Sequence, residues 1–121
     1  MRSVFRKIMA LVVAFAACAG IVPAANAEMF GADVSGWNAQ ARADCARIPG
    51  DFLIVKATEG TGFKFPQFDQ CVSQALNAGK RVAAYHYARP SRSSSLAEAN
   101  HFLDAVRPYR GRIWTFLDYE D

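Results

Sequence analysis

The feature that most constrains the fold is a regular alternation of short apolar runs with segments of helical periodicity. The clearest run is residues 52–58, FLIVKAT, in which apolar side chains are almost continuous. Parallel strands that are covered on both faces carry such runs. Further strand-like runs lie at residues 30–36, 81–88 and 113–119. The sequence therefore predicts four parallel strands in a β-α-β-α-β-α-β order.

The segments between these runs have the three- and four-residue spacing of a helix face. Between the second and third strands, the apolar positions are Phe68, Cys71, Val72, Ala75 and Leu76. Between the third and fourth, Ser94 or Ser95 caps a helix that ends at Pro108. Glu98, three residues after Ser95, would complete a capping box. The shorter and more polar segment 39–48 is expected to form the first helix.

Strands and helices that alternate in this way form right-handed parallel crossovers, either in an open α/β sheet or in part of a (β/α) barrel. Four strands cannot close a barrel, and the last strand lacks a covering helix. We therefore expect residues 28–121 to be part of a longer domain. A small open sheet, complete in itself, is the alternative.

The N-terminus has the layout of a secretory leader. The first seven residues carry three cationic side chains, and residues 8–22 form an apolar run without charge. Ala25-Asn26-Ala27 then provides an A-x-A cleavage site, so we predict a signal peptide at 1–27 and a secreted or periplasmic protein that begins at Glu28. The alternatives are a membrane anchor, for which the run is short, and a lipoprotein acylated at Cys18.

Removal of this leader also removes the positive charge of the chain. The 14 Lys and Arg residues fall to 11, which equals the 11 Asp and Glu residues. No basic run remains that would track a phosphate backbone, so nucleic acid is not an expected partner. An uncharged wall polymer fits the neutral chain better.

Two cysteines follow the leader, Cys45 and Cys71. An exported protein meets an oxidising compartment, so we predict a disulfide between them, with two buried thiols as the alternative. Two cysteines without a nearby histidine pair do not make a zinc site, and no metal is expected.

Polar residues stand at the carboxyl end of every predicted strand, where parallel α/β folds bind their ligands. Asp118 and Glu120 are one residue apart on the last strand, and the period of two places both on one face. Close carboxyls divide into one that holds its proton and one that stays ionised, as glycoside hydrolysis requires. Asp33 would add a third carboxylate. A polar, solvated strand end is the alternative reading.

Other strand-end residues have two readings each. Trp37, Tyr85 and Tyr87 could stack on sugar rings or pack in the core. Glu59 could bind substrate hydroxyls or begin a turn. Arg89 could pair with an acid of the site or form a surface ion pair. Lys56 and Thr58 also lie at a strand end, and His86 could orient a carboxylate or pack in the interior.

Four segments taken together resemble the glycoside hydrolases of family 25, the lysozymes sometimes called the Chalaropsis type. In order, they are residues 31–38 (GADVSGWN), 52–60 (FLIVKATEG), 84–90 (AYHYARP) and 116–120 (FLDYE). The resemblance covers nearly all of the chain after the leader. It implies the N-terminal half of a TIM-like (β/α) barrel that cleaves the β-1,4 bond between N-acetylmuramic acid and N-acetylglucosamine in peptidoglycan, without a cofactor.

Carried over by motif position, the resemblance makes Glu120 the general acid, Asp118 the carboxylate that assists or stabilises the cationic centre, and Asp33 a third acidic member. It leaves open whether a carboxylate or the acetamide oxygen of the substrate attacks the anomeric carbon. The later strands of the family domain do not occur in this sequence. An inactive relic, or a peptidoglycan-binding protein without catalysis, is therefore the alternative function.

Overall fold

The computed structural model describes residues 28–120 of the chain. The predicted leader at 1–27, with the candidate lipoprotein residue Cys18, lies outside the described residues, as does Asp121. Within the described part, no helix is long and apolar enough to cross a membrane.

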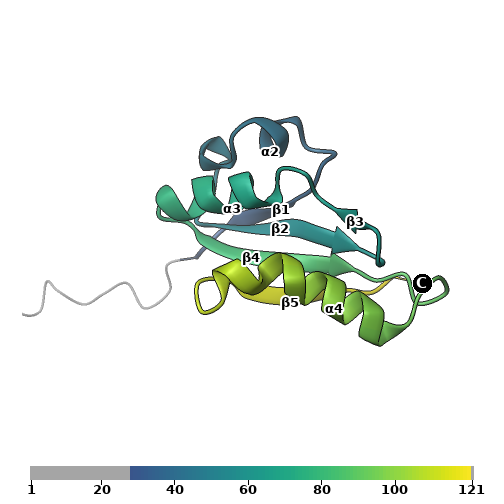
Figure 1. The fold of residues 1–121 in the computed structure, drawn as a ribbon. Coiled ribbons are helices and arrows are strands. Elements are labelled where there is room, and N and C mark those ends of the chain that lie inside the picture. Colours follow the sequence, from purple (N-terminus) through teal and green to yellow (C-terminus); the bar gives the residue numbers. More distant parts are fainter. Residues whose placement is uncertain (1–27, 121) are drawn as a thin grey trace, which may run out of the picture.

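The strands form one sheet (Figure 1). They are β1 (Gly31–Val34), β2 (Phe52–Glu59), β3 (Phe63–Lys64), β4 (Arg81–Tyr87) and β5 (Trp114–Asp118). The spatial order is β1-β2-β4-β5, and all three pairings on this path are parallel. The predicted set of four parallel strands is therefore confirmed.

One strand, β3, escaped prediction because two residues are too few to show a pattern. It pairs antiparallel with the end of β2, through Thr58 with Lys64 and Glu59 with Phe63. The chain reverses between the two strands at Gly60, whose φ of +54° is accessible to glycine at little cost.

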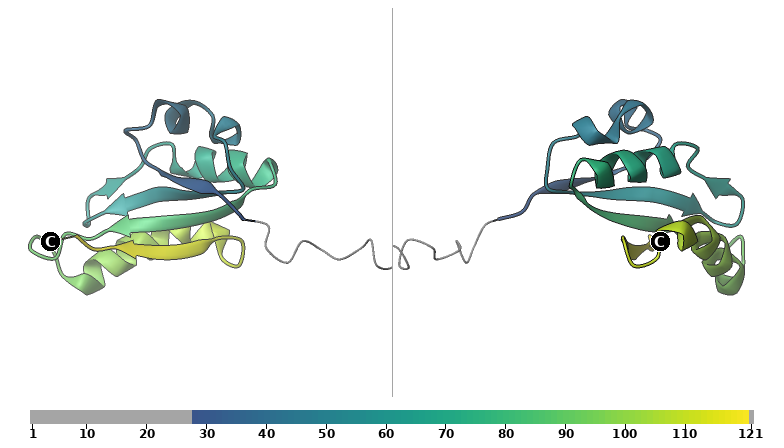
Figure 2. Two further views of the ribbon diagram at one scale, coloured as in Figure 1. Left: turned by 180° about the vertical axis from the view of Figure 1, so that it is seen from behind. Right: turned by 60° about the vertical axis from the view of Figure 1, so that its left-hand side comes forward.

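Three helices connect the parallel strands, as predicted: α2 (Ala39–Ala43), α3 (Phe68–Asn77) and α4 (Ser95–Val106). Short 3-10 turns follow α2 at Cys45–Arg47 and α4 at Arg107–Tyr109. The helices lie in front of the sheet in Figure 1 and behind it when the molecule is turned by 180° in Figure 2. Within residues 28–120, helices cover one face of the sheet and none covers the other, the bare face.

Two helix predictions need correction. The first helix ends at Ala43 because Asp44 is extended (φ −158°) and its carboxylate accepts a hydrogen bond from Ala46 N, which starts the 3-10 turn. The capping box is wrong: Ser94 is the N-cap, and its Oγ accepts from Ala97 N at 3.2 Å. Glu98 is only 4% exposed and turns into the interior.

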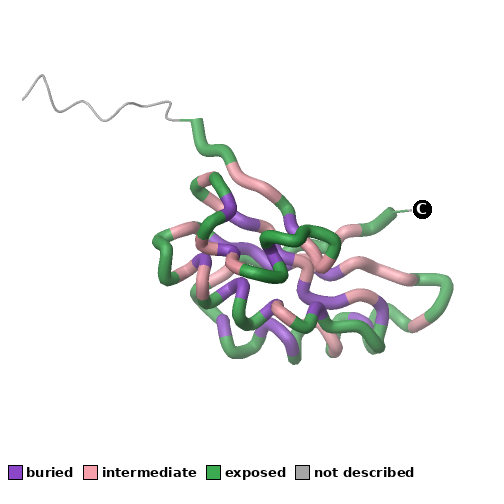
Figure 3. Tube along the Cα trace, turned by 90° about the horizontal axis from the view of Figure 1, so that it is seen from above, coloured by how far each residue is buried: buried purple, intermediate pink, exposed green. Residues whose placement is uncertain are grey.

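The core lies between the sheet and its helices, and Figure 3 shows buried residues gathered there. On the sheet side the core includes Leu53, Val55, Val82 and Ala84. Phe68 is fully buried and packs edge-on against Tyr109, with 5.8 Å between ring centroids. A disulfide joins Cys45, in the turn after α2, to Cys71 in α3.

Strand periodicity sends the alternate residues to the bare face. On β4, Val82, Ala84 and His86 are buried toward the helices, whereas Tyr85 and Tyr87, on either side of His86, are half-buried on the other face. Parallel register continues this face onto β5, where Trp114 pairs with Ala83 and Phe116 with Tyr85. The bare face therefore collects aromatic side chains, and the carboxyl ends of its strands carry the acids.

Candidate active site

A hollow of about 520 Å³ lies on the bare face at the carboxyl ends of the strands. The three candidate carboxylates and the three candidate stacking aromatics all line it. The full lining is Asp33, Ser35, Trp37, Ile54, Lys56, Tyr85, Tyr87, Phe116, Leu117, Asp118 and Glu120. Side chains from β1, β2, β4 and β5 thus meet in one place.

Register explains why the acids converge. Asp33 pairs with Ile54 on β2, and Asp118 pairs with Tyr87 on β4, so both acids project from the bare face. Glu120 lies two residues beyond Asp118 and lines the same hollow, whereas Tyr119 lines a different hollow, beside α4. The alternation of side chains continues past the end of β5 and brings Asp118 and Glu120 together, as the spacing predicts.

The carboxylates change the ionisation of their neighbours. Partial burial, with the negative charge of Glu120 beside it, raises the pKa of Asp118 above its ordinary value. Burial and the charges of Asp33 and Asp118 raise the pKa of Tyr85 to about 12, so its hydroxyl remains a donor. The Tyr87 hydroxyl donates to Glu120 Oε2 at 3.2 Å. Two phenols and three carboxylates therefore share one hollow.

A cluster of charged residues holds the ring of Tyr87. Lys56 Nζ lies 5.0 Å from the ring centroid and Arg89 Cζ lies 4.6 Å from it, both within cation–π range. Both cations bind Glu59: Lys56 Nζ at 2.5 Å, and Arg89 through Nε at 2.8 Å and Nη2 at 2.5 Å. The hydrogen bond from Lys56, joined by those from Arg89, lowers the pKa of Glu59.

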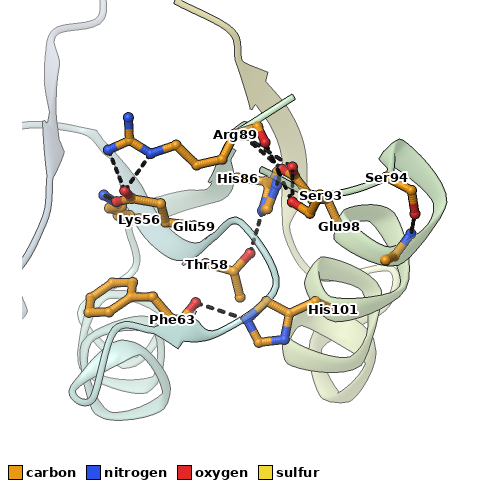
Figure 4. Close-up of polar contacts among 11 residues, drawn as sticks. Lys56, Thr58, Glu59, Phe63, His86, Arg89, Ser93, Ser94, Glu98 and His101 are labelled. Carbon is orange, nitrogen blue, oxygen red and sulfur yellow. Dashed lines mark hydrogen bonds and ion pairs between the residues drawn. The ribbon is translucent and has the colours of Figure 1, made fainter. Parts of the chain in front are cut away.

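The contacts of Glu59 and Arg89 differ from those expected of substrate-binding residues. Neither residue lines the hollow. Glu59 has both oxygens occupied by cations, and Arg89 pairs with Glu59 and not with Asp118 or Glu120. Figure 4 shows Arg89 and Lys56 bound to Glu59. The same two cations lie over the ring of Tyr87, so Glu59 supports Tyr87 through them.

A β-bulge in β2 makes this cluster possible. Lys56 pairs with Tyr85, but Thr58 and not Ala57 pairs with His86, so one extra residue sits in β2. The bulge shifts the alternation, and Lys56 and Glu59 reach the same face although they are three residues apart. It also turns Thr58 inward, where it is fully buried. A strict period of two could not have predicted this change.

His86 lies on the helix side of the sheet, away from the hollow. Its Nδ1 is 2.8 Å from Thr58 Oγ1, and its Nε2 is 2.7 Å from Glu98 Oε2. This order resembles a nucleophile, base and acid, but the Thr58 hydroxyl is fully buried and out of reach of a substrate. His86 therefore orients Glu98, a carboxylate outside the candidate site.

Glu98 accepts several hydrogen bonds in the interior. They come from Arg89 N at 2.9 Å, Ser93 Oγ at 2.5 Å and His86 Nε2. Burial alone would raise the pKa of Glu98, but these hydrogen bonds outweigh it and lower that pKa to about 2. Because an ionised carboxylate can only accept, His86 Nε2 carries the proton of their shared hydrogen bond.

This lowered pKa predicts how stability depends on pH. A carboxyl with a folded pKa of about 2 stabilises the fold above its ordinary pKa of about 4.3 and loses that contribution as pH falls toward 2. We expect the wild type to exceed Glu98→Gln in free energy of unfolding at pH 6.5, and the excess to shrink at pH 3. Urea unfolding of both proteins at both pH values measures the two free energies of unfolding. Acids that are the same in the two proteins cancel when one free energy is subtracted from the other. An excess that is equal at both pH values would contradict the assignment.

Lys56 and Ser35 also line the hollow, although their places at predicted strand ends gave neither residue a predicted role. The spacing of two residues between Ile54 and Lys56 could have placed Lys56 in the site, because it puts both side chains on one face of β2, and both line the hollow. Within residues 28–120, no group of three histidine, cysteine or acidic residues is placed to hold a metal ion.

Comparison with known proteins adds independent findings. Residues 32–121 match the family model described as glycosyl hydrolases family 25. The chain is similar to lysozyme M1 of Streptomyces globisporus, with 40% identity over 83 residues, which are 68% of this chain and 28% of that protein. It is also similar to an N,O-diacetylmuramidase of Arthroderma benhamiae, with 35% identity over 104 residues, 80% of this chain and 44% of that protein.

Among solved structures, the chain resembles a family GH25 lysozyme from Aspergillus fumigatus. The TM-score is 0.59 at 30% identity, over 74% of this chain and 44% of that one. The chain thus spans less than half the length of each of these relatives.

Proposed function

The chain belongs to the glycosyl hydrolases of family 25, and from this premise we propose that it contributes an active site that hydrolyses peptidoglycan. The bond cleaved is the β-1,4 link between N-acetylmuramic acid and N-acetylglucosamine. Solved relatives are TIM-like barrels, and the open parallel sheet is part of such a barrel. The activity is proposed for these residues together with the remainder of the family domain.

One observation carries this proposal: three carboxylates and four aromatic residues line a single hollow at the carboxyl ends of the strands. Carboxylates supply the acid and the stabilising anion of glycoside hydrolysis. Aromatic faces suit the apolar faces of sugar rings. Trp37 is 92% exposed at the rim of the hollow and is free to stack on a sugar.

We assign the roles as follows. Glu120 protonates the leaving oxygen, and Asp118 stabilises positive charge at the anomeric carbon or orients the group that attacks it. Asp33 faces the same hollow from β1 and adds negative charge there. Tyr87 donates to Glu120 and fixes its direction. Tyr85 and Trp37 contact the sugar.

The sequence of the leader supports a location outside the cytoplasm for this reaction. Residues 1–27 have the charge, apolar run and cleavage triplet of a signal peptide, and peptidoglycan lies beyond the membrane. We propose a secreted or periplasmic protein that starts at Glu28. Sequencing the N-terminus of the exported protein tests this directly.

Product analysis tests the proposed bond. Purified peptidoglycan is digested with the protein at its natural length, and the fragments are reduced with borohydride and identified by mass spectrometry. We expect reduced N-acetylmuramic acid at the new ends. Reduced N-acetylglucosamine would mean the other glycosidic bond, and retention on peptidoglycan without new ends would favour a binding protein.

A further inference from the structure

Glu98 is a buried carboxylate that the proposed chemistry does not use. It lies in the first turn of α4, is 4% exposed, and points toward the sheet. A buried carboxylate is costly unless several donors satisfy it. Here Arg89 N, Ser93 Oγ and His86 Nε2 all donate to it (Figure 4).

Two of these donors come from the end of the strand that carries the site, and Ser93 lies further along the loop, just before α4. His86 belongs to β4, and Arg89 N is two residues beyond Tyr87 in the loop that leaves the strand. Ala88, between them, donates its amide to Asp118 O at 2.9 Å. Glu98 therefore fixes the loop backbone next to both β4 and β5.

From Arg89 the contacts continue to the hollow. The Arg89 guanidinium binds Glu59 and lies against the ring of Tyr87. The hydroxyl of that ring donates to Glu120 Oε2. A continuous set of contacts thus joins a buried residue of α4 to the candidate general acid.

We propose that Glu98 is a positioning residue of the active site, which holds the Arg89 backbone so that the guanidinium keeps Tyr87, and through it Glu120, in the reactive arrangement. This inference rests on the proposed function. It assigns Glu98 a role beyond that of a helix-terminal acid, because its oxygens bind the loop and the strand and not the N-terminal amides of its own helix.

A double-mutant cycle in kcat, on the protein at its natural length, tests this role. Misplacement of a reacting group by a fraction of an ångström to 1 Å costs up to about 100-fold, so we expect Glu98→Gln to lower kcat about 10- to 100-fold. In an Arg89→Ala background, where the guanidinium link is already lost, Glu98→Gln should lower kcat further by only about 2-fold, since residues in one network are non-additive.

Ser94→Ala is the matched control. It removes the N-cap hydrogen bond at the same end of α4 and costs about 1 kcal/mol of stability, without touching Arg89. We expect its kcat to stay at the wild-type level. The positioning role would be overturned if Glu98→Gln lowered kcat by the same factor in the wild-type and Arg89→Ala backgrounds. It would also be overturned if Ser94→Ala lowered kcat as much as Glu98→Gln does. If Glu98→Gln fails to fold, Ser93→Ala, which removes a single donor, takes its place in the cycle.

A second readout does not depend on hydrolysis. The Arg89 Nε–H donates to Glu59, so its NMR signal should be protected from solvent exchange in the wild type and in Ser94→Ala, and should lose that protection in Glu98→Gln. Unchanged protection in Glu98→Gln would refute the inference. A wild type that releases no reducing ends, but shows this pattern, would refute the proposed function and leave the contact pathway standing.

Discussion

Glu120→Gln is expected to lower peptidoglycan hydrolysis about 10²- to 10⁴-fold, the range of a lost general acid. The fold should survive, because Glu120 lies exposed beyond β5 and a glutamine oxygen can still accept from the Tyr87 hydroxyl. The measurement is the rate of release of reducing ends by the protein at its natural length. Urea unfolding of the same samples separates lost chemistry from lost structure.

Asp104→Asn provides the control for this experiment. Asp104 is also an exposed carboxylate, 69% accessible, but it pairs with Arg107 at the far end of α4. Its loss removes the same charge without entering the hollow, so we expect wild-type turnover. Undiminished turnover in Glu120→Gln would exclude Glu120 as the acid.

Removal of the disulfide is expected to cause the largest loss of stability. Cys45 and Cys71 are 26 residues apart in sequence, and closing a loop of this size contributes about 3–4 kcal/mol in the chain-entropy model. Cys45→Ala/Cys71→Ala should lower the free energy of unfolding by about that amount. Chemical unfolding at neutral pH without reductant measures the difference.

The wild type with and without dithiothreitol is the matched comparison. Reduction should lower its stability toward that of the double variant, while the double variant should not respond to reductant. A wild type that is equally stable under both conditions would indicate two free thiols and remove the proposed cross-link between the turn after α2 and helix α3.

Much of the fold could be predicted because its signals are local. The apolar run of β2 and the periodicity of α3 each specify an element without reference to the rest of the chain. The parallel direction of the strands then follows from the alternation of strands and helices. Asp118 and Glu120 could be placed on one face from their spacing, and the side chains keep this alternation as far as Glu120 although β5 ends at Asp118.

The remaining features depend on contacts between distant segments. The bulge at Ala57 leaves no sequence pattern, yet it decides that Glu59 faces Lys56 and that Thr58 faces His86. Glu98 has the spacing of a capping acid, but three donors from β4 and its following loop draw it inward. Partner choice among charged residues is set by tertiary geometry, which explains why Arg89 pairs with Glu59.

The two acids at the end of β5 present a contrast that bears on mechanism. Family resemblance makes Glu120 the proton donor, whereas burial and the charge of Glu120 raise the pKa of Asp118. A raised pKa alone would make Asp118 the carboxyl that keeps its proton. The raised pKa of Asp118 therefore does not identify the acid that donates the proton. A kinetic comparison of variants at the two positions identifies it.

The most direct measurement is the rate on two muramoyl glycosides, one with a sugar leaving group and one with a dinitrophenyl leaving group that needs no protonation. We predict that Glu120→Gln is strongly impaired on the first substrate but within about 10-fold of the wild type on the second, because only the first requires the acid. Asp118→Asn should be impaired on both. Recovery of Asp118→Asn, in place of Glu120→Gln, on the dinitrophenyl substrate would contradict the assigned roles.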